Sequence, residues 1–429
     1  RAINYKKIAV IGLGYIGLPT ACMFATNGIR VLGVDVNVPV VNTLNNGCIH
    51  LEEHGLQQKF TDAFQSGMLK VSLNLEEADA FIIAVPTPFY DEKKADMRYV
   101  ASATESVLPH LRKGNLIVLE STSPPQTTSV LVKSILEKSG LKAGEDFLLA
   151  YSPERVLPGQ ILRELVENAR VIGGINQESA EAGRDLYRTF VKGDIILTDS
   201  TTAEMVKLME NTYRDVNIAI ANEFSRLADR FNIDIQEAIQ IANLHPRVKI
   251  LNPGPGVGGH CISVDPWFLV EAAPDLAKLI RTAREVNDSQ PYFVFSSIKN
   301  TFGELRGKHI CVLGLTFKPD VDDVRESPAI EIVKMLKNEG AIVSAYDPHK
   351  SGVIEKIQTS PTLEAALQNA ELIVVLVAHT VFKTLSPHAI KNQTKSPIGI
   401  FDTVNIIGEN WDEAGFTVYR LGNSKKLLQ

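Results

Sequence analysis

The chain has 429 residues, of which 45% are hydrophobic and 22% charged, and its formal net charge is −6. This length is too great for one ordinary hydrophobic core and favours two or three domains. Lysine and arginine are dispersed along the sequence rather than clustered. The pattern argues against a nucleic-acid partner, because binding to a phosphate backbone requires a concentrated basic face.

Membrane attachment and disulfide bonding are also disfavoured. No stretch of the sequence approaches the roughly 20 apolar residues that a membrane-spanning helix requires. Residues 1–7 are polar and run straight into a strand-like segment, so we expect no signal peptide. Cys22, Cys48, Cys261 and Cys311 lack CxxC spacing, which favours free thiols in a cytoplasmic protein.

The first part of the chain alternates apolar runs with helical patterns. Residues 8–12, 30–34, 80–85 and 116–120 are short apolar runs typical of buried parallel strands. A helical pattern over residues 18–27 joins the first two runs. Strands alternating with helices over about 150 residues predict a doubly wound α/β domain.

The middle of the chain has a different pattern. Residues 201–231 form one long helical pattern without glycine or proline, and a second helical pattern covers residues 276–302. Between them, residues 252–261 are too rich in glycine and proline for a helix or a strand.

The last third resembles the first. Residues 309–314, 341–347 and 369–377 repeat, in order, the opening strand with its glycine, the strand that ends on Asp35, and a later buried strand. Gly314 is not followed by a second glycine-rich element, so only the N-terminal copy is expected to bind a dinucleotide.

These patterns predict an α/β fold in which two Rossmann-like doubly wound domains are joined by a helical central domain with a long connecting helix. The boundaries that we expect are residues 1–200, 201–302 and 303–429.

The turn Gly12-Leu13-Gly14-Tyr15-Ile16-Gly17 has the GxGxxG pattern between a predicted strand and a predicted helix. Glycines let the backbone approach a pyrophosphate, which binds at the positive helix N-terminus. Asp35 ends the next strand, where its carboxylate can accept hydrogen bonds from a ribose and would repel a 2′-phosphate. The sequence therefore predicts an NAD site. Thr87 is a weaker candidate for the same crevice, and a tight turn without a ligand is the alternative.

Cys261 lies in the segment 258–265, where glycines leave room for a substrate. A cysteine in such a loop is a candidate nucleophile if a cation or a helix N-terminus stabilises its thiolate. A packed, inert cysteine is about as consistent with this spacing. No metal site is expected, because His260 and Cys261 are adjacent and have no second pair at ligand spacing.

Three polar residues elsewhere are weaker candidates. Lys207 and Asn211 are four residues apart on the long helix and would face the same way, where they could stabilise an oxyanion. Glu154 follows a strand-like run and could act as a base. A solvated helix face and an exposed loop are the alternatives.

Six ordered motifs together resemble the UDP-glucose/GDP-mannose dehydrogenase family over essentially the whole chain. They are the segments 12–17, 120–122, 152–154, 203–211, 258–265 and 315–327.

This resemblance implies an enzyme with NAD in the N-terminal domain and the nucleotide of a UDP-sugar in the C-terminal domain, and a homodimer formed through the central helix. A C6 alcohol is oxidised in two steps, with the intermediate aldehyde held on Cys261. The resemblance implies that Cys261 is the nucleophile and that Lys207 stabilises the oxyanion with Asn211 beside it. Asp265 would position water or Lys207, and Thr122 and Glu154 would serve proton transfer and hydrolysis. Thr122 and Arg325 are also implied as NAD contacts, and the implied substrate contacts are Glu154, Arg155, Val156, Lys207, Asn211, Gly258 and Lys318.

One departure bears on the substrate. The UDP-glucose enzymes carry a second glutamate four residues after Glu154, and Pro158 stands there in this chain. The segments 152–159, 244–248 and 264–268 instead resemble family members acting on 2-acetamido sugars, in particular UDP-N-acetyl-D-mannosamine, with Arg247 as a further substrate contact. The uronates made by such enzymes are used for surface polysaccharides.

Other activities remain open at this stage. The same chemistry could act on UDP-GlcNAc, UDP-glucose or GDP-mannose. A two-electron hydroxyacid dehydrogenase would leave Cys261 and the second α/β domain unexplained. An inactive nucleotide-sugar binding protein predicts decayed catalytic positions, whereas Cys261, Lys207, Asn211 and Asp265 are all present.

Overall fold

The structure is a computed structural model that describes residues 4–90, 92–395 and 398–424. The chain divides into two compact units, one formed by residues 1–210 with 271–274 and the other by residues 211–270 with 275–429. Among the described residues, no helix is both long and apolar enough to cross a membrane. Residues 1–3, part of the segment for which no signal peptide is predicted, lie outside the described residues.

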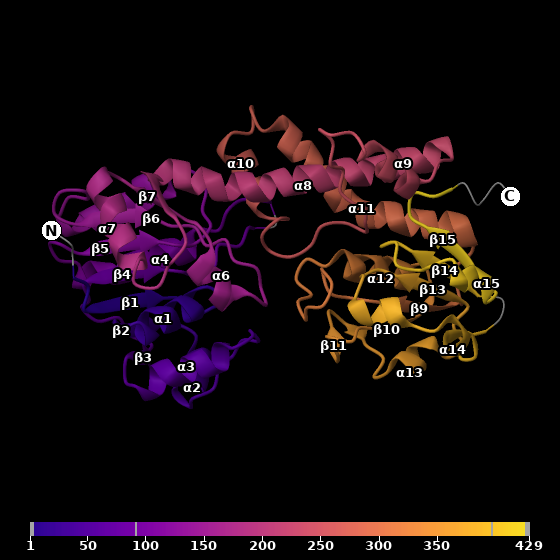
Figure 1. Cartoon of the computed structure of the whole chain (residues 1–429), viewed down its shortest axis with the longest axis horizontal. Helices are drawn as coiled ribbons and strands as arrows, with labels where there is room; N and C mark the ends of the chain where they lie inside the picture. Colours follow the sequence, from indigo (N-terminus) through magenta and orange to yellow (C-terminus); the bar gives the residue numbers. More distant parts are fainter. Residues whose placement is uncertain (1–3, 91, 396–397, 425–429) are drawn as a thin grey trace. The chain divides into compact units, whose positions relative to one another are not determined.

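The first unit is built on an eight-stranded sheet (Figure 1). Its order, β3-β2-β1-β4-β5-β6 followed by β7 and β8, begins with the strand order of a dinucleotide-binding fold. All neighbouring strands are parallel except β6 and β7, which are antiparallel. The strands are β1 Lys7–Ile11, β2 Arg30–Val34, β3 Leu69–Ser72, β4 Ala80–Ile83, β5 Leu116–Leu119, β6 Leu148–Tyr151, β7 Arg170–Gly174 and β8 Ile195–Asp199.

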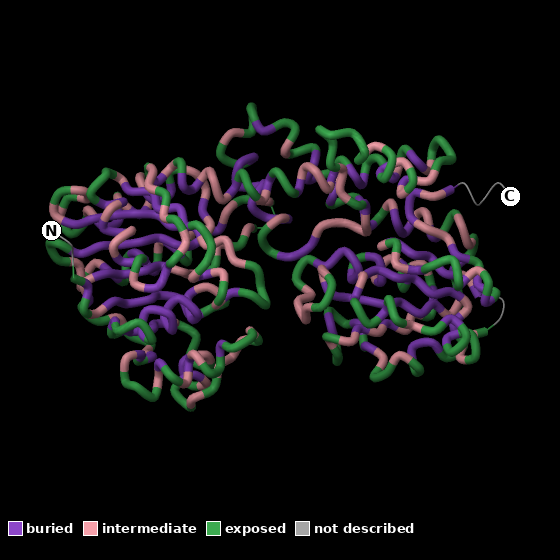
Figure 2. The backbone as a smooth tube through the Cα atoms, viewed as in Figure 1, coloured by how far each residue is buried: buried purple, intermediate pink, exposed green. Residues whose placement is uncertain are grey.

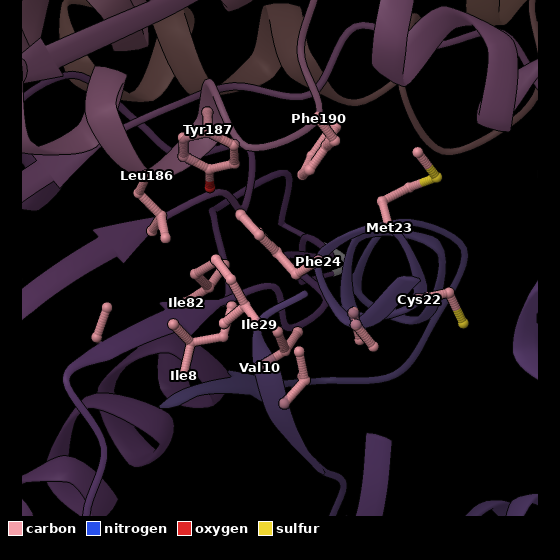
Figure 3. Close-up of a cluster of buried hydrophobic side chains, with 14 of the residues drawn as sticks. Ile8, Val10, Cys22, Met23, Phe24, Ile29, Ile82, Leu186, Tyr187 and Phe190 are labelled. Carbon is pink, nitrogen blue, oxygen red and sulfur yellow. The ribbon is translucent and has the colours of Figure 1, made fainter. Parts of the chain in front are cut away.

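Helices cover both faces of this sheet. They are α1 Gly17–Thr26, α2 Val38–Asn45, α3 Leu56–Gln65, α4 Arg98–Val107, α5 Lys133–Leu136, α6 Ile161–Glu167 and α7 Gln177–Tyr187. Because side chains alternate along a strand, Ile8 and Val10 of β1 join the core under α1 and α7, whereas Ala9 and Ile11 join the core under α4 and α5. In the first core, Phe24 of α1 packs against Tyr187 and Phe190 (Figure 3).

Helix α8 (Ser200–Phe231) is a single helix of 32 residues that passes from the first unit into the second. Helix α10 (Asp265–Ala272) also crosses a unit boundary, at residue 271. The remaining helices of the second unit are α9 Ile235–Ala242, α11 Lys278–Phe302, α12 Pro328–Asn338, α13 Leu363–Leu367, α14 Pro387–Lys391 and α15 Asn410–Glu413.

The second unit contains a five-stranded parallel sheet in the order β10-β9-β13-β14-β15. Its strands are β9 His309–Leu313, β10 Ile342–Tyr346, β13 Leu372–Val375, β14 Gly399–Asp402 and β15 Thr417–Arg420, and a hairpin joins β11 Val353–Ile354 to β12 Ile357–Gln358. Ile310 and Val312 pack towards α11 and α12, and Cys311 and Leu313 towards α13 and α15. Figure 2 shows the inner strands of both sheets, such as β1, β4 and β13, as buried segments.

The predicted fold class, two Rossmann-like domains with a helical centre, is confirmed. The internal repeat is also present. Gly12 and Gly314 both follow a first strand with a positive φ, +95° and +98°, and Asp35 and Asp347 both follow the second strand. The sequence analysis did not identify β3, β7 or β8 in the first sheet, and β6 is the strand-like run that it placed before Glu154.

A buried ion-pair network ties three parts of the first unit together. The Arg170 guanidinium on β7 donates to Ser152 Oγ at 2.9 Å, Glu154 Oε2 at 3.1 Å and Glu120 Oε1 at 3.0 Å. Its plane lies over the ring of Tyr187, whose hydroxyl donates to Glu120. Glu120 is 2% exposed and Arg170 5%. Two carboxylates therefore share one buried cation where strands β5, β6 and β7 meet.

We predict that Glu120→Gln changes how stability depends on pH. Burial, opposed by the charge of Arg170, raises the pKa of Glu120 to about 7. Between the ordinary pKa of glutamate and pH 7, the folded chain holds a proton that the unfolded chain has released, so stability falls as pH rises through this range. Glutamine does not titrate, so this contribution disappears. Urea unfolding between pH 5 and 7 should show a shallower decline for the variant than for the wild type.

Glu77→Gln serves as the control for the exchange of a glutamate for a glutamine, since the Glu77 side chain is 68% exposed. Equal slopes for wild type and Glu120→Gln would show that Glu120 does not titrate in this range.

Candidate functional site

The glycine-rich turn after β1 is shaped by very close backbone contacts. A Cβ on Gly17 would lie 1.7 Å from Gly12 O, and a Cβ on Gly12 would lie 2.5 Å from Ala84 O. A Cβ on Gly14 would meet no described atom within 4 Å, and Gly14 is exposed. The turn therefore leaves an open backbone surface directly before α1, where the helix N-terminus favours an anion such as a pyrophosphate.

Asp35 is fixed beside this turn. Its Oδ2 accepts from Leu13 N at 2.9 Å and its Oδ1 from Asn37 N at 2.9 Å. The carboxylate is half-buried and keeps lone pairs for further donors, as a ribose-binding acid requires. These residues fit an adenine dinucleotide without a 2′-phosphate, in agreement with the prediction of NAD.

Two further loops lie at the carboxyl ends of β4 and β5 and carry Thr87 and Thr122, both half-buried. Ser121 Oγ donates to Val85 O at 2.7 Å, which ties the two loops together. Glu204 of α8 accepts from Gln126 N at 3.0 Å and from Thr128 N at 2.9 Å, so it holds the Thr122 loop against the helix that carries Lys207.

Glu154 follows β6, and its side chain is 8% exposed. One carboxylate oxygen accepts from Arg170 at 3.1 Å and the other from Arg155 N at 2.9 Å. Arg155 itself pairs with Glu210 at 2.6 Å, and Val156 packs on the first core. The backbone and the buried Arg170 therefore hold Glu154 in one orientation.

The loop that carries Pro158 is held by two acidic side chains. Glu164 accepts from Leu157 N at 2.7 Å, and Glu53 accepts from Gly159 N at 2.8 Å and from Ile161 N at 3.0 Å. The loop that departs from the UDP-glucose pattern is thus anchored by Glu53 from a distant segment, a contact that no local sequence signal predicts.

In the second unit, Cys261 lies in a turn before α10. Cys261 O accepts from Val264 N at 3.1 Å and from Asp265 N at 2.8 Å. Cys261 and Cys48 are exposed, whereas Cys22 and Cys311 are buried. A helix N-terminus favours the thiolate form of a nearby cysteine.

Two glycines let the Cys261 turn pack against the segment after β9. A Cβ on Gly258 would lie 2.5 Å from Glu326 O, and one on Gly259 would lie 2.9 Å from the Phe317 ring. Gly259 N also donates to Arg325 O at 2.9 Å. Larger side chains at either glycine would force this part of the second unit apart.

The second unit brings together several residues that the sequence selected. Asn211 Nδ2 donates to Asp265 Oδ2 at 2.6 Å, and Asp265 is the first residue of α10. Lys207 belongs to the first unit and lies one helical turn before Asn211 on α8, half-buried. Arg247 is exposed after α9, and Arg325 forms a bidentate pair with Asp323.

A pocket of ≈ 110 Å³ lies at the carboxyl ends of β9, β13 and β14. In a 2-1-3-4-5 sheet this is the point where the strand order reverses, which is the expected ligand position. Lys318 is half-buried in its wall. The lining residues are Pro255, Gly256, Thr316, Phe317, Lys318, Pro319, Pro328, Ala329, Leu376, Val377, Ala378 and Val404.

The second unit uses Asp347, its counterpart of Asp35, in internal contacts. Asp347 Oδ2 accepts from Leu315 N at 2.7 Å and contacts His379 Nε2 at 2.9 Å, and Asp347 and His379 are both buried. The buried His379 ring thus contacts the Asp347 carboxylate, whereas the corresponding carboxylate in the first unit, Asp35, is half-exposed. This difference supports the prediction that only the N-terminal copy binds a dinucleotide.

Asp320, His349 and His379 place one possible metal-ligand atom each within 4.8 Å of one another. His379 Nδ1, however, accepts from Asp320 N at 3.0 Å, and the Asp320 carboxylate accepts from Thr380 N at 2.9 Å. These groups are already used in hydrogen bonds that hold the loops after β9 and β13.

Sequence reasoning gave no role to four buried charged residues near the proposed site, although Glu120 and Glu204 fall within the motif segments 120–122 and 203–211. Glu120, Arg170, Glu204 and Arg284 are buried polar residues whose partners are distant in the chain. A charged residue inside an otherwise apolar run, as at Arg170 before Val-Ile-Gly-Gly, is the one local signal that could have marked any of them.

Replacing Gly14 or Gly17 by alanine should separate cofactor binding from folding. The added methyl of Gly14→Ala has room in the chain but projects where a pyrophosphate would approach. We expect an unchanged thermal midpoint and an NAD affinity lowered about tenfold or more, which corresponds to about 1.4 kcal/mol.

Gly17→Ala should instead lower the thermal midpoint, because its Cβ meets Gly12 O. Calorimetric NAD titration and thermal unfolding measure both effects, and wild-type NAD affinity in Gly14→Ala would contradict the assignment.

Comparison with known proteins agrees with this geometry. Sequence models of the UDP-glucose/GDP-mannose dehydrogenase family match residues 6–191 as the NAD binding domain, 201–289 as the central domain and 311–409 as the UDP binding domain. The UDP-N-acetyl-D-mannosamine dehydrogenase of Methanococcus maripaludis is 50% identical over 98% of both chains. The NDP-N-acetyl-D-galactosaminuronic acid dehydrogenase of Ralstonia nicotianae is 47% identical over 91% of this chain and 95% of its own.

Among solved structures, the UDP-D-ManNAc dehydrogenase from Pyrococcus horikoshii has a TM-score of 0.90 and 41% identity, covering 98% of this chain and 100% of its own. The chain therefore binds NAD and belongs to the UDP-glucose/GDP-mannose dehydrogenase family of NAD-dependent oxidoreductases.

Proposed function

We propose that the chain catalyses the four-electron oxidation of UDP-N-acetyl-D-mannosamine at C6 to UDP-N-acetyl-D-mannosaminuronate, with Cys261 as covalent catalyst. The observation that carries this proposal is the position of Cys261: its side chain is exposed, and it lies in the turn that leads into α10, where its carbonyl oxygen accepts from Val264 N and Asp265 N. A cysteine kept only for packing would be buried, as Cys22 and Cys311 are.

The covalent route explains why a cysteine is needed. Removal of two electrons and two protons converts the C6 alcohol into an aldehyde, and the thiol adds to it as a thiohemiacetal. A second two-electron oxidation gives a thioester, and water then releases the carboxylate and restores the thiol. NAD, when bound, accepts the two electrons removed at each oxidation. Because the aldehyde stays attached to sulfur, it cannot leave between the two steps.

Lys207 and Asn211 are proposed to stabilise the oxygen that becomes negative in these steps. An ammonium and an amide placed one helical turn apart offer donors to the same small volume. The bond from Asn211 Nδ2 to Asp265 fixes the amide, and one amide hydrogen stays available to donate. Asp265 is thereby assigned to orient Asn211 and a reacting water.

Glu154 and Thr122 are proposed to move protons. The two carboxylate oxygens of Glu154 each accept one bond within the protein, and a carboxylate oxygen has a second lone pair with which to accept from water. The Thr122 hydroxyl, half-buried on a loop that Glu204 anchors, can relay a proton. Both belong to the first unit, as does Lys207.

The pocket after β9 is proposed to hold the nucleotide end of the substrate, with the Lys318 ammonium towards a phosphate. Several assignments remain predictions from the sequence. They are the substrate contacts Arg155, Val156, Arg247 and Gly258 and the NAD contacts Thr87 and Arg325. The domain division at residues 200 and 302 and the cytoplasmic location are also predictions.

The choice of sugar rests on the 154–161 loop and on the relatives. Pro158 replaces the second glutamate of UDP-glucose enzymes, and proteins named for UDP-N-acetyl-D-mannosamine are about half identical to this chain. The product is proposed to supply a uronate for surface polysaccharide. The galactosaminuronic acid relative makes another acetamido sugar the second candidate.

The stoichiometry of the reaction tests this mechanism. We expect about two NADH per UDP-N-acetyl-D-mannosamine consumed, because four electrons leave the sugar. Cys261→Ser should lose this turnover by about three orders of magnitude or more, since the covalent intermediate cannot form. Cys48→Ser, which also removes an exposed thiol, is the matched control and should keep the wild-type rate.

One NADH per sugar, unaffected by Cys261→Ser, would instead support a two-electron alcohol or hydroxyacid dehydrogenase. Turnover of UDP-GlcNAc, UDP-glucose or the galactosamine epimer without turnover of UDP-N-acetyl-D-mannosamine would keep the mechanism and replace the substrate.

We also propose that two chains associate through α8. Within the second unit, this helix exposes large apolar side chains at spacings of seven, four, three and four residues: Tyr213 (72% exposed), Ile220 (41%), Phe224 (37%), Leu227 (46%) and Phe231 (69%). These spacings place them along one side of the helix. An exposed apolar stripe of this kind is typical of a protein interface, and a second copy of the same helix is its simplest partner.

Leu227→Asp and Phe224→Asp should separate the two chains, because burying a carboxylate in an apolar interface is unfavourable. Light scattering after size exclusion should give the mass of two chains for the wild type and of one chain for the variants. Leu279→Asp, an exposed apolar position on α11 at 70%, is the control. A wild-type chain that is monomeric at micromolar concentration would overturn this proposal.

A further inference from the structure

Arg284 on α11 is a fully buried arginine that the proposed reaction does not use. Its side chain is 0% exposed, its Nε donates to Asp215 Oδ2 at 2.9 Å, and its Nη1 donates to Ser263 O at 2.6 Å. Asn287, one turn further along α11, donates to Asp215 Oδ1 at 2.8 Å. Burying a guanidinium costs desolvation free energy. The groups that Arg284 contacts therefore indicate its role.

One of these contacts ends on the turn that carries Cys261. Ser263 is two residues after Cys261, and its hydroxyl donates to Gly259 O across the turn. Cys261 O accepts from Val264 N and Asp265 N, which fixes the same residues at the start of α10. Arg284 thus holds the carboxyl side of the turn, while Gly259 N is bound to the segment after β9.

The arginine is not fully satisfied by its surroundings. Among the described residues, Nη2 of Arg284 is buried and has no hydrogen-bond partner. Asp215 supplies one buried negative charge, and Asp288, 3.5 Å from Nη1, is 42% exposed. An apolar side chain could fill the space between α8 and α11 without burying a charge. It would also avoid the cost of a buried N–H group that has no acceptor.

We propose that Arg284 is a positioning residue for the nucleophile: its bond to Ser263 O holds the 259–265 turn so that the Cys261 thiol stays at the N-terminal end of α10. This inference rests on the proposed role of Cys261. The guanidinium acts through the Ser263 carbonyl and the backbone of the turn, and the helix N-terminus then favours the reactive thiolate.

Arg226 provides a matched comparison. It lies on α8, and its guanidinium donates to Gln290 Oε1 at 3.0 Å, Val286 O at 2.9 Å and Ser289 Oγ at 2.9 Å. Each of these bonds ends on α11, so Arg226 ties the same two helices together without any bond to the Cys261 turn. If activity depends only on the packing of α8 against α11, substitution of either arginine should lower it. If activity depends on the position of the Cys261 turn, only substitution of Arg284 should lower it.

The test compares Arg284→Met, Arg284→Lys and Arg226→Met in a Cys48→Ser chain, where Cys261 is the exposed thiol. We expect Arg284→Met to lower kcat about tenfold or more with the KM for UDP-sugar and NAD within about twofold. Iodoacetamide should label Cys261 about fivefold more slowly at pH 7, and at wild-type rate near pH 10, where an accessible thiol is ionised in any case. Arg284→Lys, which can still donate to Ser263 O, should be intermediate.

Arg284→Met leaves Asp215 buried without its cation, so Asp215→Asn/Arg284→Met is made alongside it to keep a folded chain. If either folded Arg284→Met variant keeps the kcat and the labelling profile of Arg226→Met, the positioning role is overturned and Arg284 only supports packing. The labelling experiment measures the reactivity of the Cys261 thiol itself. It therefore decides about Arg284 even if Cys261→Ser retains full turnover, a result that would reject the proposed function itself.

Discussion

The approach of helix α1 to the end of strand β1 is the constraint on which the first unit depends. A Cβ at residue 17 would lie 1.7 Å from Gly12 O, so the backbone of the turn would have to shift to admit one. This contact fixes the start of the helix against the strand. Gly14, where an added Cβ would meet no described atom within 4 Å, is left as an open backbone surface. Folding and dinucleotide binding thus place different demands on glycines three residues apart.

The second unit repeats this design and changes its use. Gly314 has the same positive φ as Gly12, and Asp347 accepts from the backbone after β9 as Asp35 does after β1. In the second unit, however, His379 is buried against the aspartate, and the open volume lies instead at the strand ends near Lys318. One fold therefore supplies two kinds of nucleotide site, which differ in the residues placed at the carboxyl ends of the strands.

The strands that the sequence revealed were those with continuous apolar runs, such as β1, β4 and β13, and the long helix α8 was evident because no glycine or proline interrupts it. Strand β7 was missed because it begins with Arg170, which sequence patterns assign to the surface. The glycine turn, Asp35 and the Cys261 turn could be found because their residues are close in sequence. The contacts of Arg170 with Glu120 and of Arg284 with Asp215 join residues 50 and 69 positions apart, which only the folded chain brings together.

Each unit contains a buried guanidinium that is bonded to a part of the site proposed above. Arg170 fixes Glu154 while Glu120 shares its charge, and Arg284 fixes the Ser263 carbonyl while Asp215 balances its charge. Such pairs contribute little net stability, since desolvation offsets much of the attraction. These pairs instead fix the orientation of the groups that accept from the guanidinium, because its planar set of donors permits few arrangements of its partners. Methionine or leucine could fill either space, but neither could orient a carboxylate or a turn beside it. These contacts support the proposal that the two buried arginines serve the site rather than the packing of the core.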